Sequence, residues 1–128
     1  MSGATQQFQN GSLLITVVRS ATVTTISWSG ESDARTPGEF LNPIVSKLAK
    51  DLSGLDVSID FSQLTYMNSA TVAPLITCIK ALDATASSVL VVFSDMDWQR
   101  THVQCVRTIS RQLKKVRIEV RGKSESAE

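Results

Sequence analysis

The residue pair with the clearest chemical potential in this sequence is Asn68-Ser69, which lies where an alternating strand pattern gives way to a helical one. The first N–H groups of a helix have no intrahelical partner, and the peptide dipoles add up to a partial positive charge there. A phosphate at such a position is stabilised, so Ser69 is a candidate phosphoryl acceptor. Asn and Ser are also both good N-cap residues, and the pair can equally be interpreted as a helix cap without chemistry.

The other reactive side chains do not combine into a catalytic or metal-binding set. The single histidine, His102, falls inside a helical pattern, where an imidazole packed on a helix is the simpler interpretation. Cys78 and Cys105 form no CxxC pair and lie in apolar helical patterns, so we expect two buried, reduced thiols. No phosphate-binding loop of the form GxGxxG or GxxxxGK[ST] occurs. These observations predict a protein that is not an enzyme and has no metal ion and no cofactor.

The composition narrows the range of partners. A chain of 128 residues with a formal net charge of +1 fits one domain and gives no indication of a nucleic-acid partner. No apolar run approaches the about 20 residues that span a bilayer, and residues 1–12 lack the charged and apolar regions of a secretory signal. We therefore expect a cytoplasmic protein with no membrane insertion.

The patterns around Asn68-Ser69 alternate between strand and helix. Helical patterns follow Thr36-Pro37-Gly38-Glu39, which has the form of a capping box, then Ser69, and finally Asp95 or Asp97. Strand patterns occur at residues 13–18, 22–28, 57–67, 89–93 and 116–120. The order ββαβαβαβ predicts an α/β fold with a mixed, mostly parallel sheet of about five strands and packed helices.

Two details complete the predicted organisation. Residues 89–93 form a continuous apolar run, which is typical of a central strand covered on both faces. Outside a single domain of residues 13–121, we expect a flexible lead at residues 1–12 and a flexible tail at residues 122–128. Exposed edge strands are compatible with a monomer or a weak dimer.

From about Leu13 to Val120, the chain resembles the STAS domain family, in particular the bacterial anti-sigma factor antagonists. The resemblance rests on the turn ISWSGESDART, on the strand VSIDFSQLTYMNS and on the helix that begins at Ser69. The family usually has a G-E-x-D-like turn, a strand of the form V-x-L-D-L-S-x-V-x-Y-I and then D-S-[ST]-G-L. The chain departs from the last motif at two positions, where Asn68 replaces the aspartate and Thr71 replaces the glycine.

The resemblance implies a single STAS-like domain that acts as a non-enzymatic regulatory module. In such proteins the motif serine, Ser69 here, is phosphorylated by a GHKL-type kinase that is also the anti-sigma factor, and a cognate phosphatase reverses the reaction. The unphosphorylated form binds that partner. The residues that match the family's turn, strand and motif are expected to form the partner-docking surface, namely Gly30, Glu31, Asp33, Asp60, Met67, Asn68, Ala70, Thr71 and Val72.

Two other functions stay open at this point. A STAS subunit could bind constitutively in a sensory or transport assembly, through the same surface and without a phosphate. A small nucleotide-binding protein or enzyme could also use this architecture, because a fold does not determine a function.

Overall fold

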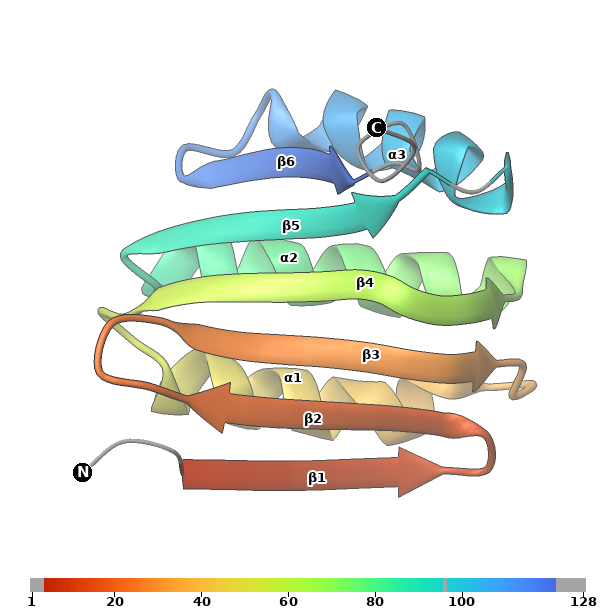
Figure 1. Ribbon diagram of the computed structural model, residues 1–128, viewed down its shortest axis with the longest axis horizontal. Helices are drawn as coiled ribbons and strands as arrows, with labels where there is room; N and C mark the ends of the chain where they lie inside the picture. Colours follow the sequence, from red (N-terminus) through yellow and green to blue (C-terminus); the bar gives the residue numbers. More distant parts are fainter. Residues whose placement is uncertain (1–3, 96, 122–128) are drawn as a thin grey trace, which may run out of the picture.

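The computed structural model describes residues 4–95 and 97–121 (Figure 1), so the predicted flexible tail at residues 122–128 lies outside the described residues. The described residues form a sheet with helices packed against it. In chain order the elements are β1 (Ala4–Asn10), β2 (Leu13–Arg19), β3 (Thr24–Ser32), α1 (Pro37–Asp51), β4 (Asp56–Met67), the 3-10 helix η1 (Ser69–Thr71), α2 (Val72–Thr85), β5 (Ser88–Ser94), α3 (Asp97–Ser110) and β6 (Val116–Arg121).

The six described strands form one mixed sheet, in which the spatial order β1-β2-β3-β4-β5-β6 is the chain order. The first three strands pair antiparallel. From β3 to β6 each strand pairs parallel with the next, and one of the helices α1, α2 and α3 makes each connection. The prediction of an α/β fold with a mixed sheet is therefore confirmed.

The prediction of about five strands was wrong, because residues 4–10, expected in a flexible lead, form a further strand. Ala4–Asn10 form β1 and pair antiparallel with β2 along their whole length. Gly11 has a φ of 60°, which suits the first position of the two-residue loop between the strands. The sequence of β1, ATQQFQN, lacks the apolar alternation that signals a strand. Strand β1 forms because its backbone pairs with the apolar strand β2. The side chains of β1 itself give no indication of this pairing.

Helix α1 begins at Pro37 as predicted, but the Thr36 side chain makes no capping hydrogen bond. The predicted capping box is therefore not formed. Pro37 occupies the first helical position, and it has no backbone N–H that would need an acceptor there. This proline is sufficient to start the helix without a side-chain cap.

All described helices lie on one face of the sheet, behind it in Figure 1. One core cluster unites apolar side chains of α1, α2 and α3 with alternate residues of the strands. At its centre Phe61 packs against Trp28 and Phe93, with ring centroids 5.1 and 5.2 Å apart. Aromatic pairs at these separations contribute about 0.5–1.5 kcal/mol beyond their buried area.

The prediction that β5 is covered on both faces agrees with its buried residues, although all described helices lie on one face of the sheet. Its residues Val89, Val91 and Phe93 belong to the core cluster, whereas Val92, which lies between two of them in the strand, faces the opposite side of the sheet. Val92 is nevertheless only 1% exposed, because it lies between Asp60 of β4 and Glu119 of β6. Neighbouring side chains within the sheet thus cover Val92 on the face without described helices.

Candidate functional site

The predicted site lies at the connection between β4 and α2, which we call the Ser69 junction and define as residues 67–72. Strand β4 ends at Met67, and Asn68 continues the extended backbone with φ −82° and ψ 170°. The Asn68 side chain then accepts a hydrogen bond from the backbone N–H of Thr71, with Oδ1 and N 3.1 Å apart. The predicted role of Asn68 as a cap is confirmed, although it caps the 3-10 helix η1, and α2 follows directly after that.

A buried polar network fixes the Ser69 junction to the end of β3. The Thr71 side chain is 0% exposed, and its Oγ1 donates to Asn68 Oδ1 at 2.7 Å. Ser32 Oγ lies 2.7 Å from the same Thr71 oxygen, and the backbone N–H of Asn68 donates to the Ser32 carbonyl at 2.9 Å. Because buried hydroxyls are costly unless they are hydrogen-bonded, these contacts make Thr71 a structural residue.

The amide nitrogen of Asn68 completes the network. Nδ2 donates to the carbonyl oxygen of Ala34, in the turn after β3, at 2.8 Å. A carboxylate in this place could still accept from Thr71, but it has no proton to donate to the Ala34 carbonyl. The two departures from the family motif, Asn68 and Thr71, therefore belong to one set of hydrogen bonds.

Ser69 takes no part in this network. Its side chain is exposed and makes no hydrogen bond to any residue that the structure describes, and the following Ala70 is exposed as well. Ser69 and Ala70 are the first residues of η1, so their N–H groups have no acceptor within the turn. The arrangement presents a hydroxyl to solvent on a turn that other residues hold in place.

Two acidic residues predicted for the docking surface lie beside the Ser69 junction. The end of β3 runs parallel to the end of β4, with Glu31 opposite Tyr66 and Ser32 opposite Met67. Glu31 and Asp33 are both exposed at this end of the sheet. The negative charge of these carboxylates therefore borders the surface around Ser69.

Other predicted docking residues serve the fold more than the surface. Met67 is buried and Val72 is partly buried against the core, so neither is fully available to a partner. Gly30 has a φ of 88°, and a Cβ there would lie 1.9 Å from the Ser12 carbonyl oxygen. Gly30 is thus required for the close approach of β3 to the loop before β2.

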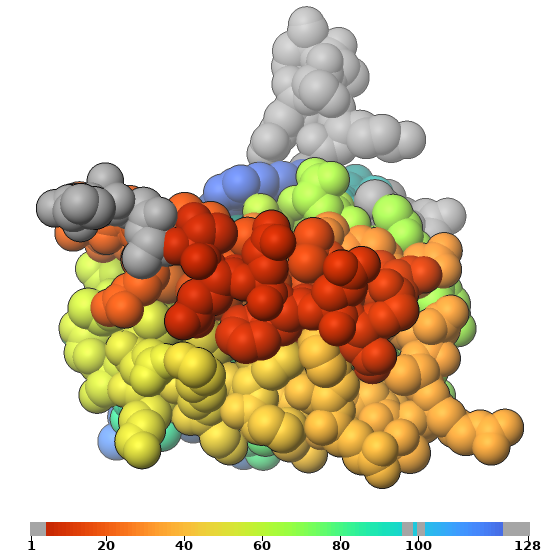
Figure 2. All heavy atoms as spheres, turned by 90° about the horizontal axis from the view of Figure 1, so that it is seen from below, coloured from red at the N-terminus to blue at the C-terminus, as the bar shows by residue number. Residues whose placement is uncertain are grey.

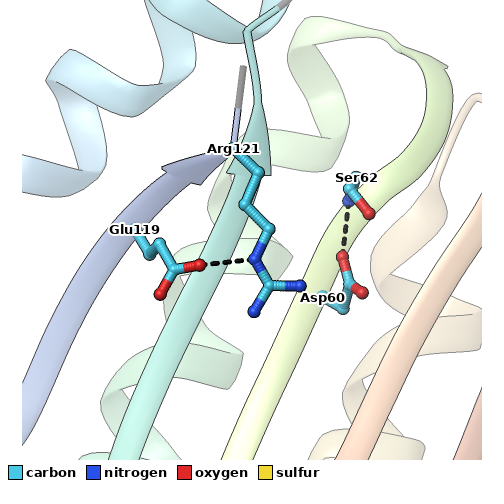
Figure 3. Close-up of polar contacts among 4 residues, drawn as sticks. All are labelled: Asp60, Ser62, Glu119 and Arg121. Atoms are coloured by element: carbon cyan, nitrogen blue, oxygen red, sulfur yellow. Dashed lines mark hydrogen bonds and ion pairs between the residues drawn. The ribbon is translucent and has the colours of Figure 1, made fainter. Parts of the chain in front are cut away.

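Asp60 does not belong to the Ser69 junction. Asp60 lies in the first half of β4, which continues to Met67. Asp60 lies on the open face of the sheet, where its Oδ1 accepts from the backbone N–H of Ser62 at 2.8 Å (Figure 3). Arg121 of β6, which forms an ion pair with Glu119, lies on the same face. Asp60, which was expected on the docking surface, is therefore separated from the Ser69 junction by the rest of β4.

Sequence analysis missed Gln99 of α3, which holds the last part of β4. Pairing between β4 and β5 ends at Asp60, and the two strands separate beyond it. Gln99 fills the gap: its Nε2 donates to the carbonyls of Phe61 and Leu64, at 3.2 and 2.9 Å. Its Oε1 accepts from the backbone N–H of Ser94 at 2.8 Å. A polar side chain thus replaces the missing strand ladder, a role that no periodic pattern reveals.

A second residue missed by sequence analysis is Tyr66, which is 47% exposed next to the Ser69 junction. The register of β3 and β4 shifts between Ser27 and Ser29 and again between Gly30 and Glu31. These irregularities break the strict alternation of β4, so the side of the strand on which Tyr66 lies could not be read from spacing. Exposed tyrosines are frequent in protein interfaces.

The titratable groups away from the junction include the two cysteines and His102. Burial raises the pKa of the Cys78 thiol to about 12, whereas Cys105 is exposed, so the expectation of two buried thiols was wrong for Cys105. Loss of hydration lowers the pKa of His102. Across residues 4–95 and 97–121, no three His, Cys, Asp or Glu side chains group as metal ligands. None of the helices described is both long and apolar enough to cross a membrane.

Comparison with known proteins gives no further assignment: no protein-family model matches the chain, and no curated protein sequence is significantly similar to it. The geometry of the Ser69 junction is therefore the basis on which a function can be argued.

Proposed function

We propose that the protein is a non-enzymatic bacterial regulatory module that binds a protein partner through the Ser69 junction in the cytoplasm. Phosphorylation of Ser69 releases that partner, as in the anti-sigma factor antagonists that the sequence resembles. The kinase is a GHKL-type anti-sigma factor, and a phosphatase restores the binding form. The observation that carries the proposal is an exposed serine hydroxyl at the start of a turn that is fixed by its neighbours.

The separation of the hydroxyl from the supporting network favours a reversible switch. Asn68, Thr71 and Ser32 hold the turn with their own hydrogen bonds, and Ser69 contributes none of them. A phosphate on Ser69 therefore changes the surface without removing a contact on which the fold depends. It adds about 1.5–2 negative charges at neutral pH, beside the exposed carboxylates of Glu31 and Asp33.

The effect on a partner follows from this charge. A protein that packs against the neutral hydroxyl would have to desolvate the phosphate, and any acidic group on its surface would be repelled. If the phosphate makes the free energy of binding about 3 kcal/mol less favourable, the affinity for the partner falls more than a hundredfold. A change of this size is sufficient to convert a mostly bound population into a mostly released one.

The first test is phosphorylation itself. The protein is incubated with ATP and the GHKL-type kinase encoded beside its gene, and the product is measured by intact mass and site mapping. We expect one phosphate on the wild type, none on Ser69→Ala, and one on the control Ser53→Ala, which removes an exposed serine after α1. Equal incorporation into Ser69→Ala would refute Ser69 as the acceptor.

A second test separates the switch from constitutive binding. Constitutive binding is favoured by one observation: the family's aspartate is absent, because position 68 is an asparagine bonded to Ala34. Proteins that co-purify with the wild type are compared with those that co-purify with Ser69→Glu. The switch predicts loss of the partner from Ser69→Glu and also its release from the wild type when the kinase and ATP are added, whereas a constitutive subunit of a sensory or transport assembly would take up no phosphate and keep its partner under the second condition.

A further inference from the structure

Strand β1 is an open edge of the sheet. Among the described residues it has a neighbour on one side only, which is β2. Figure 2 shows β1 in red along one side of the molecule, above the surface of α1. Gln6, Gln7 and Gln9 are exposed, and Phe8 is partly buried against the core. An edge of this kind presents backbone N–H and C=O groups to any strand that approaches.

The two edge strands of the sheet differ in the side chains that protect them from pairing with a further strand. Proteins usually guard edge strands with charged side chains, proline or a bulge. Strand β6 has the sequence VRIEVR and carries Arg117, Glu119 and Arg121. Strand β1 has the sequence ATQQFQN, with no charge and no proline, and it pairs with β2 without a register shift. Of the two edge strands that the structure describes, β1 is therefore the better suited to pairing with a further strand.

The alternation of the ladder defines which backbone groups of β1 point outward. A two-residue loop, Gly11-Ser12, joins Asn10 to Leu13, and the residues that flank such a loop form a hydrogen-bonded pair. Every second residue counted back from Asn10 then bonds to β2, so the groups of Gln9 and Gln7 point outward. Gln7 is the central residue of the strand Ala4–Asn10.

We propose that β1 pairs antiparallel with β1 of a second copy of this chain, with Gln7 opposite Gln7 on a two-fold axis. In this register the two Gln7 residues exchange backbone hydrogen bonds, and Gln9 lies opposite Thr5. The two six-stranded sheets then become one continuous sheet. Pairing through β1 leaves Ser69 exposed, because η1 follows β4, three strands away.

Side chains support a second copy as the partner. In this register each Phe8 lies opposite Gln6 of the other copy, and the two Phe8 side chains become diagonal neighbours on the helix-covered face. Diagonal residues of an antiparallel pair are about 7–8 Å apart, which aromatic rings can bridge. Because β1 is uncharged, two copies bring no like charges together, whereas β6 pairing with itself would oppose its charged residues.

The oligomeric state tests the proposal. Sedimentation of the full chain from low micromolar to submillimolar concentrations should show a monomer–dimer equilibrium. Gln7→Lys places two ammonium groups at the axis and should raise the dissociation constant at least about tenfold. The control Thr16→Lys carries the same charge on the neighbouring strand, directly opposite Gln7 within one copy, and should dimerise like the wild type. Circular dichroism verifies that both variants fold.

Disulfide trapping tests the register. In a Cys105→Ser background, Gln7→Cys should form an intermolecular disulfide, since opposed Cα atoms in a hydrogen-bonded pair are about 5.5 Å apart. Gln9→Cys should not, because the two copies of residue 9 would be about 14 Å apart. A wild type that is monomeric at every concentration would overturn the proposal and leave β1 to a strand of another protein. A dimer that Gln7→Lys does not weaken would overturn it in favour of another surface.

Discussion

The Asn68 side chain hydrogen-bonds through both its oxygen and its nitrogen, which explains why an asparagine occupies this position. Oδ1 accepts from the backbone and side chain of Thr71, while Nδ2 donates to the Ala34 carbonyl. Aspartate, serine or threonine could cap the turn equally well, but none of them can also make this donation from an amide. The residue therefore connects the start of η1 to the turn after β3.

We predict that Asn68→Asp destabilises the protein even though aspartate is a good cap. The variant keeps the acceptor for Thr71 but places an oxygen against the Ala34 carbonyl oxygen, so a hydrogen bond is lost and two acceptors face each other. The free energy of unfolding in urea at neutral pH should fall by about 1–3 kcal/mol.

The control for this variant is Ser69→Asp, which adds the same charge one residue later, where the side chain is exposed. Its free energy of unfolding should stay within about 0.5 kcal/mol of the wild type. If both variants lose the same amount, repulsion from Glu31 and Asp33 would explain the effect, and the bond to Ala34 would have no special role.

At the scale of secondary-structure elements, the Ser69 junction depends on how β4 ends. Two register shifts lengthen β4 relative to β3, and β5 stops pairing with it at Asp60. The last residues of β4 are therefore held by β3 on one side and by Gln99 of α3 on the other. Helix α3 thus contributes to the position of Ser69, although it is remote in sequence.

We predict that Gln99→Leu, which has a similar volume, lowers the free energy of unfolding by about 3 kcal/mol or more. The reason is that the carbonyls of Phe61 and Leu64 and the N–H of Ser94 lose their partner together. Hydrogen exchange at residues 61–71 should accelerate in the variant. Gln104→Leu changes an exposed glutamine of the same helix and should be close to neutral. A Gln99→Leu variant as stable as Gln104→Leu would contradict the role assigned to Gln99.

Sequence patterns predicted the features that depend on local physics. The apolar alternation of residues 57–61 gave β4, and the cap at Asn68 followed from the preference of helix starts for such residues. Features that depend on distant partners were not predictable. Strand β1 needs β2, Gln99 acts on two other strands, and the side of β4 on which Tyr66 lies depends on bulges against β3.

At the scale of the whole molecule, the two cysteine thiols lie in different environments, so their reactivities test the surface and the core separately. Cys105 is exposed, whereas Cys78 is buried among the apolar residues of α2. Only the thiolate reacts rapidly, and a buried thiol with a pKa of about 12 stays protonated at neutral pH.

We predict that a thiol reagent modifies one cysteine of the native protein quickly, and that Cys105→Ser abolishes this fast phase. Cys78 should react only as fast as the protein unfolds, so urea should accelerate its modification in proportion to the unfolded fraction. The folded state also loses stability as the pH rises from 9.0 towards about 12, because the unfolded chain releases the thiol proton first. A fast reaction of Cys78 in native Cys105→Ser would show that the core opens locally.

The strand order of the sheet also has a consequence for how the chain folds. Each strand lies beside the strand that precedes it in the sequence, so no strand has to be inserted between two that are already paired. Paired strands are therefore always consecutive in the sequence, and the loops that close are shorter than in a sheet where a later strand is inserted between earlier ones. The sheet can grow one strand at a time from the β1–β2 hairpin while the ribosome is still synthesising the rest, with β1 available for pairing before α3 exists.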